Sequence, residues 1–128
     1  KNNFITILTD SIYKTIDTLI LLLGTIIIFL ILSNLITLLP INDKLVLFSK
    51  GILEMTQGIK FVANSGLSLL IKTMLITFFI SFGGLTVHLQ VSSIISNSKI
   101  KYKNFLIARI FHSFISTILV YLLFNLFF

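Results

Sequence analysis

The 128-residue chain has no cysteine and no tryptophan, a single proline and only four acidic residues. Without cysteine it forms no disulfide, zinc thiolate site or thiol nucleophile. The few carboxylates are not paired in any pattern typical of catalysis, and no nucleophile lies near a base in a recognisable motif. The two histidines are far apart in the sequence, so we expect no metal site and no cofactor. These absences argue against an enzyme.

Charge of either sign is also scarce. Charged residues make up 11% of the chain and hydrophobic residues 56%, with a mean hydropathy of +1.09, whereas a soluble domain is about 25% charged. The composition therefore predicts an integral membrane protein. Ten basic residues give a net charge of +6, and most of them lie between apolar runs, which is typical of topology signals rather than of nucleic-acid binding. We expect no nucleic-acid partner.

Two segments have the length and composition of simple spanning helices. Residues 18–39 carry no charge, and 22 residues at 1.5 Å each give roughly 33 Å, about the thickness of the hydrocarbon core. Pro40 ends this segment. Residues 104–128 form the last spanning helix, in which we expect Arg109 to extend to the interface. Residues 1–17 contain several charges and are interpreted as an interfacial connector or, equally well, as a helix at the membrane surface.

Residues 41–66 are too charged and too rich in glycine to span the membrane. The segment around Glu54, Gln57 and Gly58, followed by Asn64, resembles a re-entrant helical hairpin that enters and leaves the membrane on one side. Such hairpins place helix ends and amides at membrane depth, where they can bind a polar solute. The alternative is an amphipathic surface helix with Glu54 in solvent.

Residues 67–98 are predicted to form a second membrane-embedded element, an apolar segment interrupted at Gly83-Gly84. Broken helices in membranes occur where the backbone is buried in protein or lines a wet cavity, and a helix beginning after Gly84 would direct its N-terminal dipole toward an anion. The alternative is that the glycines only allow close packing. The interruption is surrounded by four polar residues, Ser81, Thr86, His88 and Gln90, whereas Val87, Val91, Ile94 and Ile95 form an apolar face that we expect to contact lipid.

The loop 97–104 contains three lysines and is predicted to be cytoplasmic. With a re-entrant 41–66 segment, this places residue 17 inside and Phe128 outside. The chain begins with Lys1, and no signal peptide follows it. We therefore expect it to be the C-terminal fragment of a longer transporter.

Three stretches in this order resemble one family: 51–58 (GILEMTQG), 81–90 (SFGGLTVHLQ) and 102–109 (YKNFLIAR). The chain is similar to the C-terminal half of sporulation integral membrane proteins with nucleoside-recognition (gate) domains. The resemblance implies a permease related in fold to concentrative nucleoside transporters and located in the outer forespore membrane or the bacterial cell membrane. It also implies transport of dipicolinic acid during endospore formation. A chain of this length would need the N-terminal half of the same transporter, or a second copy, as its partner.

The sequence thus predicts an all-α integral membrane protein, a polytopic helical bundle with a re-entrant hairpin and a Gly-broken helix. We expect it to transport a small anionic solute across the lipid bilayer by alternating access. The candidate solute-binding residues are Glu54, Gln57, Asn64, Ser81, Thr86, His88 and Gln90, and the backbone geometry depends on Gly58, Gly83 and Gly84. The alternatives are a permease for nucleosides or other metabolites, and a non-transporting scaffold in which Ser81 and Gln90 stay dry.

Overall fold

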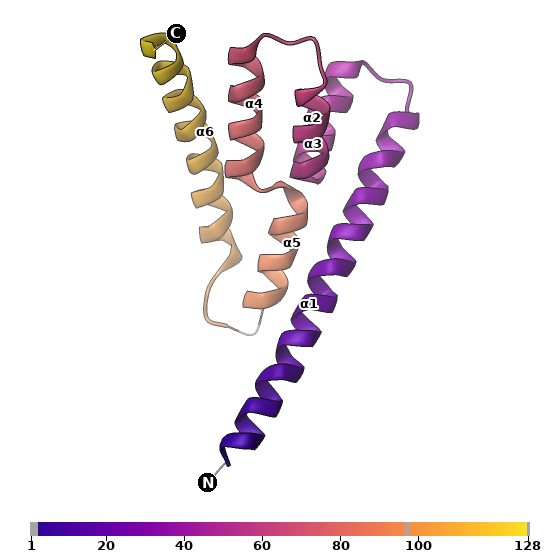
Figure 1. Ribbon diagram of the computed structural model, residues 1–128, viewed down its shortest axis with the longest axis vertical. Helices are drawn as coiled ribbons and strands as arrows, with labels where there is room; N and C mark the ends of the chain where they lie inside the picture. Colours follow the sequence, from indigo (N-terminus) through magenta and orange to yellow (C-terminus); the bar gives the residue numbers. More distant parts are fainter. Residues whose placement is uncertain (1–2, 97, 128) are drawn as a thin grey trace.

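The protein is all-helical over residues 3–96 and 98–127, which the computed structural model describes (Figure 1). The elements in chain order are α1 (Phe4–Leu35), the 3-10 turn η1 (Ile36–Leu38), α2 (Asp43–Leu53), α3 (Met55–Ala63), α4 (Leu69–Phe82), α5 (Gly84–Ile95) and α6 (Tyr102–Phe127). Three segments have the length and composition to cross a membrane: Phe4–Leu38, Leu69–Ile95 and Tyr102–Phe127. The predicted class, a polytopic helical membrane protein, is confirmed.

Helix α1 begins earlier than predicted. Its 32 residues correspond to roughly 48 Å, and no break separates residues 4–17 from the apolar segment that follows. The charged side chains of Asp10, Lys14 and Asp17 are all exposed, so they accompany a continuous helix instead of ending it. Residues 4–17 are thus the first turns of α1 and not a separate connector. The helix ends as predicted before Pro40, because Leu39 is already extended (ψ 139°).

Residues 43–63 form a helical hairpin. In Figure 1 the start of α2 and the end of α3 lie at the same end of the molecule, and the turn between them lies at about the level of the break between α4 and α5. Asn42 caps α2 by accepting a hydrogen bond from the Lys44 backbone N–H at 2.8 Å. Glu54, the residue between the two helices, is only 4% exposed. The alternative of a surface helix with Glu54 in solvent is therefore wrong.

Two glycines allow the helices of the hairpin to touch. A Cβ added to Gly58 would lie 2.2 Å from the Gly51 Cα, and one added to Gly51 would lie 2.2 Å from the Phe79 ring of α4. Phe79 is fully buried and forms the small core with Leu47 and Val62. The hairpin thus packs on α4 through contacts that allow no extra methyl group.

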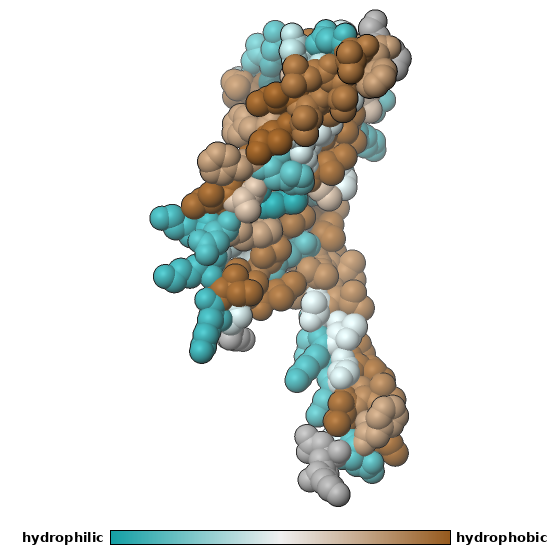
Figure 2. Space-filling model, turned by 90° about the vertical axis from the view of Figure 1, so that its left-hand side faces the viewer, coloured by the Kyte–Doolittle hydropathy of each residue, from teal (hydrophilic) through white to brown (hydrophobic). Residues whose placement is uncertain are grey.

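Helices α4, α5 and α6 complete the fold. Helix α4 descends to Gly83, α5 continues from there to the loop before α6, and α6 returns alongside α4 (Figure 1). The start of α6 faces the lower part of the molecule in Figure 1, toward which α1 also begins. Figure 2 shows that brown, hydrophobic side chains cover most of the face formed by α6, while hydrophilic ones gather at the top and around the loop before α6.

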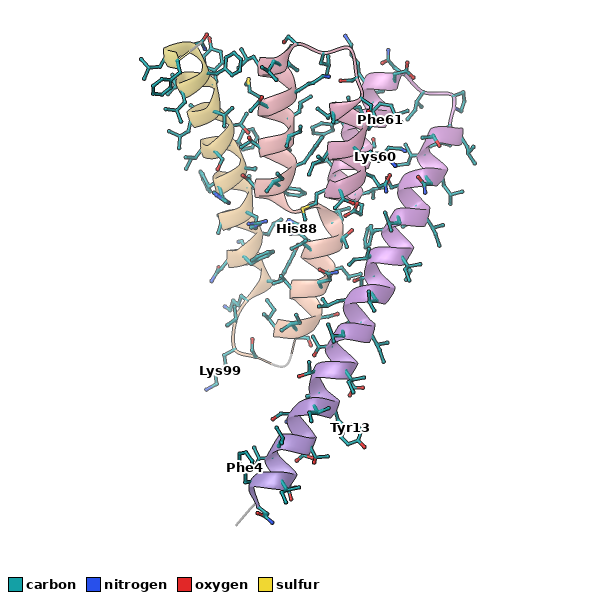
Figure 3. All side chains as sticks on the ribbon, viewed as in Figure 1. Phe4, Tyr13, Lys60, Phe61, His88 and Lys99 are labelled. Carbon is teal, nitrogen blue, oxygen red and sulfur yellow. The ribbon has the colours of Figure 1, made fainter. Side chains whose placement is uncertain are left out.

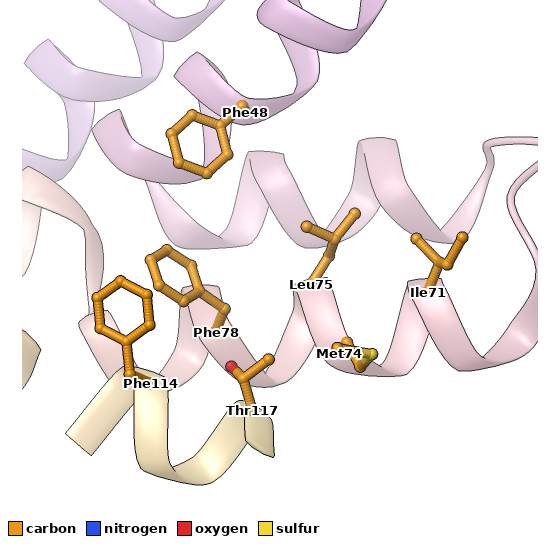
Figure 4. A pocket seen from close by; sticks show the side chains of 7 residues that line it. All are labelled: Phe48, Ile71, Met74, Leu75, Phe78, Phe114 and Thr117. Carbon is orange, nitrogen blue, oxygen red and sulfur yellow. The ribbon is translucent and has the colours of Figure 1, made fainter. Parts of the chain in front are cut away.

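A cavity of about 320 Å³ lies between α2, α4 and α6 (Figure 4). Its lining is apolar in character, and Thr117 is the single residue with a polar side chain among its seven lining residues. Such a surface offers nothing that compensates a polar solute for lost hydration. The polar chemistry of this protein lies elsewhere, at the two helix breaks.

Candidate functional site at two helix breaks

The break in the hairpin and the break between α4 and α5 lie against each other. A Cβ added to Gly84 would lie 3.1 Å from the Met55 backbone N and 3.3 Å from the Leu53 carbonyl oxygen. The Thr86 hydroxyl, 2% exposed, donates a hydrogen bond of 3.0 Å to the same Leu53 oxygen. The ends of four short helices thus meet in one place, as in transporters that bind their solute between discontinuous helices.

Gly83 and Gly84 produce the second break through their backbone conformation. Their φ angles are +91° and +67°, in the left-handed region that residues with a Cβ rarely adopt. Gly83 is the N-cap of α5 and, having no side chain, contributes no capping hydrogen bond to the first turn. The predicted Gly-broken helix is confirmed, and close packing accompanies the break, since Gly84 also touches the hairpin backbone.

Glu54 is the N-cap of α3 at the break between α2 and α3. Its carboxylate accepts hydrogen bonds from the Gln57 backbone N–H at 2.9 Å and from the Thr56 hydroxyl, so it caps the N-terminus of α3. A carboxylate at this position satisfies free N–H groups and complements the positive end of the helix dipole. The negative charge of Glu54 is therefore directed toward α3.

The last carbonyl groups of α4 are occupied by a cation from α6. Arg109 Nε donates to the Phe82 oxygen at 3.2 Å, and Arg109 Nη2 donates to the Ile80 oxygen at 3.3 Å. A cation at a helix C-terminus stabilises the negative end of the dipole. The expectation that Arg109 extends to the membrane interface is wrong: it binds the backbone at the break.

His88 connects three helices beside the same break (Figure 3). Its Nε2 lies 3.2 Å from the Phe82 carbonyl oxygen, which can only accept, so Nε2 carries a proton. In the neutral ring, Nδ1 then accepts from the Tyr102 hydroxyl at 2.8 Å. The ring borders a cavity of about 280 Å³, whose other lining residues are Phe29, Leu85, Leu89, Ser92 and Tyr102.

Gln90 holds the first helix against α5. Its Nε2 donates to the Thr25 hydroxyl at 3.0 Å and to the Leu22 carbonyl oxygen at 3.3 Å. Thr25 is 6% exposed and is a partner that the sequence reasoning did not single out. Of the predicted lipid face of α5, Ile94 is exposed, whereas Val87, Val91 and Ile95 are half-buried. Leu85 and Leu89, on the other side of the helix, are exposed as well.

The seven predicted solute-binding residues do not meet in a single cavity. Glu54 and Thr86 lie at the contact between the breaks, His88 borders one cavity and Gln90 contacts α1, while Ser81 is buried on α4 at 7% exposure. Gln57 and Asn64 line a separate cavity of about 250 Å³ on the hairpin, together with Lys50, Lys60 and Phe61. Both lysines are visible in the sequence as charges inside the 41–66 segment, but only the fold places them beside the two amides.

Comparison with known proteins gives one informative relative. The chain is 31% identical over 135 aligned positions to the sporulation integral membrane protein YlbJ of Bacillus subtilis (strain 168), and the alignment covers 91% of this chain. It covers 33% of YlbJ, so the chain spans about a third of the length of this relative. No family model and no solved structure matches. The similarity agrees with the predicted resemblance to sporulation membrane proteins. Together with the three segments of spanning length among the described residues, it shows an integral membrane protein.

Proposed function

We propose that this integral membrane protein, which is similar to a protein of sporulating cells, forms half of a transporter for a small anion. By the resemblance of its broken segments to the gate-domain family, the anion is dipicolinic acid and the process is endospore formation. The N-terminal half of the same transporter, or a second copy, supplies the rest of the path. This assignment includes no enzymatic activity and no cofactor.

The contact between the two breaks carries this proposal. Thr86 bonds to the Leu53 carbonyl oxygen at 3.0 Å, which joins the end of α2 to the start of α5, and the N-terminus of α3 lies beside them. Alternating access requires a place at which two short helices can separate without unfolding either long one. Because a single hydrogen bond joins the end of α2 to the start of α5 among the described residues, that contact is where we expect the solute path to open.

Spore dipicolinic acid content tests the proposal. The full-length protein is expressed in sporulating cells that lack their own copy, as wild type and as the Glu54→Gln, Gln90→Ala and Gly83→Leu variants. Glu54→Gln keeps an oxygen that can cap α3 while removing the charge. The control is Asn34→Ala, an exposed position on α1. We expect lower content in the three variants at equal membrane abundance. Wild-type content in all three would refute the proposal.

A non-transporting scaffold is the second candidate, and one observation favours it. His88 and Gln90 both make hydrogen bonds to other helices of the protein, as residues that only pack helices together would. The two functions differ in access to water. A cysteine introduced at Ser81 or Gln90 of this cysteine-free chain reacts with a water-soluble maleimide if a path opens there, and stays unreacted in a scaffold.

A further inference from the structure

The cavity of about 250 Å³ on the hairpin carries an unbalanced positive charge. Helix α2 contributes Lys50 to its lining, and α3 contributes Gln57, Lys60, Phe61 and Asn64. Figure 3 labels Lys60 and Phe61 on α3, well separated from His88 at the break between α4 and α5. Two lysines and two amides face this space, and no carboxylate is among the lining residues.

Lys50 is the unusual member of this set. Its side chain is only 7% exposed, and its Nζ lies 5.5 Å from the centre of the Phe61 ring. Over residues 3–96 and 98–127, no hydrogen bond or ion pair joins this ammonium to another group. A cation above a ring gains some stabilisation, but its charge is not neutralised, and a buried charge without a counter-ion is costly.

The nearest acid in the sequence does not supply that counter-ion. Glu54 follows Lys50 by one helical turn, a spacing that often gives an ion pair, yet its carboxylate is engaged in capping α3 through Gln57 and Thr56. Lys72, which lies on α4, donates to the Ala63 carbonyl oxygen at 2.9 Å and so caps the other end of α3. Lys50 and Lys60 therefore remain as the cations of the cavity.

The amides add hydrogen-bonding capacity. The Gln57 side chain makes no hydrogen bond among the described residues, so its two N–H donors are available. Asn64 Nδ2 donates to the Lys60 carbonyl oxygen at 2.8 Å, which fixes the amide at the rim. Ammonium and amide donors around a small space are the groups that bind carboxylates in proteins.

We propose that this cavity binds a carboxylate group of a small soluble organic anion, with Lys50 and Lys60 as the charge partners and Gln57 as an additional donor. The proposal rests on the transport function proposed above and deepens it, because it identifies the residues that hold the charge of the solute. In this proposal the solute path opens at the contact between the two helix breaks, and the hairpin cavity recognises the carboxylate of the solute.

Binding of dipicolinate to the purified full chain in lipid nanodiscs tests this site. Titration calorimetry compares wild type with Lys50→Met and Lys60→Met, which keep most of the apolar side chain and remove the charge. Lys44→Met, an exposed lysine of the same helix, is the matched control. We expect the Kd to rise at least tenfold in Lys50→Met and severalfold in Lys60→Met, with wild-type affinity in Lys44→Met and in the charge-conserving Lys50→Arg.

Lipid phosphate is the competing source of an oxyanion, and the nanodisc composition separates the two. If dipicolinate binds equally well in phosphatidylcholine and in phosphatidylglycerol, the cavity binds the soluble anion. If the lysine variants lose retained phosphatidylglycerol while dipicolinate binding is absent or unchanged, the cavity holds a lipid and the proposal is overturned.

Lys60 is exposed, so its substitution tests the site even if Lys50→Met folds poorly. Unchanged dipicolinate affinity in Lys60→Met and in folded Lys50→Met also overturns the site. If spore dipicolinic acid content falls in the Gly83→Leu cells but not in the lysine variants, this inference alone is wrong. If content stays at the wild-type level in the Glu54→Gln, Gln90→Ala and Gly83→Leu cells, the proposed transport function is wrong as well.

Discussion

Replacing Gly58 by alanine tests the closest contact in the structure. The added Cβ would lie 2.2 Å from the Gly51 Cα and 2.8 Å from its backbone N. Carbon atoms in contact lie about 3.5–4.0 Å apart, so α3 must move away from α2 by roughly 1.5 Å at this point. The obstacle is backbone, which no rotamer change can relieve, and overpacking of this kind costs about 1–3 kcal/mol.

The matched control is Gly24→Ala in α1, where an added Cβ would meet nothing within 4 Å. Both substitutions place alanine inside a helix and gain about 1 kcal/mol of helix propensity, so the difference between them measures the clash alone. We expect Gly58→Ala to be less stable than Gly24→Ala by about 1–3 kcal/mol. Unfolding by SDS in detergent micelles, followed by circular dichroism, gives both free energies.

A third variant separates backbone from side-chain obstruction. A Cβ on Gly51 would meet the Phe79 ring at 2.2 Å, so Gly51→Ala is expected to regain stability when combined with Phe79→Leu, whereas Gly58→Ala is not. Equal stability of Gly58→Ala and Gly24→Ala would refute the packing of the hairpin described above. Rescue of Gly58→Ala by Phe79→Leu would show that the ring, and not Gly51, limits the approach of the two helices.

Three further outcomes follow from the contacts at the break. Arg109→Met removes two charge-assisted bonds to α4 carbonyl oxygens and should destabilise the fold by about 2–3 kcal/mol, while Arg109→Lys should restore part of this loss; thermal unfolding in detergent measures both. In a double-mutant cycle, His88→Phe and Tyr102→Phe should couple by about 0.5–1.5 kcal/mol, and additive effects would contradict their hydrogen bond. A cysteine at Ser98 should react with a maleimide added to the cytoplasmic side of oriented vesicles and not from the outside, as the lysine-rich loop predicts.

The sequence indicates the elements of this fold better than the positions of its polar side chains. The run of uncharged residues before Pro40 and the Gly83-Gly84 pair predict where helices end or break, because proline restricts the backbone locally and glycine allows conformations that interrupt a helix. The start of α1 was predicted too late, since the charges at Asp10, Lys14 and Asp17 are compatible with a helix whose surface is exposed all around.

Partners of the polar groups depend on contacts between distant segments, which periodicity does not encode. Gln90 bonds to Thr25, 65 positions earlier, and Arg109 to Phe82, 27 positions earlier. A stripe of polar residues on α5 predicts that they face protein, and Thr86 and His88 do. It does not predict that one contacts the hairpin while the other contacts α6.

The Phe82 carbonyl group has a mechanical consequence. Phe82 is the last residue of α4, and its carbonyl oxygen accepts hydrogen bonds from His88 of α5 and from Arg109 of α6. A carbonyl oxygen has two lone pairs, so both are used, and the angle between α4 and α5 is held from two sides. These two hydrogen bonds therefore restrain the bend at Gly83. In a transport cycle, α4, α5 and α6 would then move together relative to the α2–α3 hairpin.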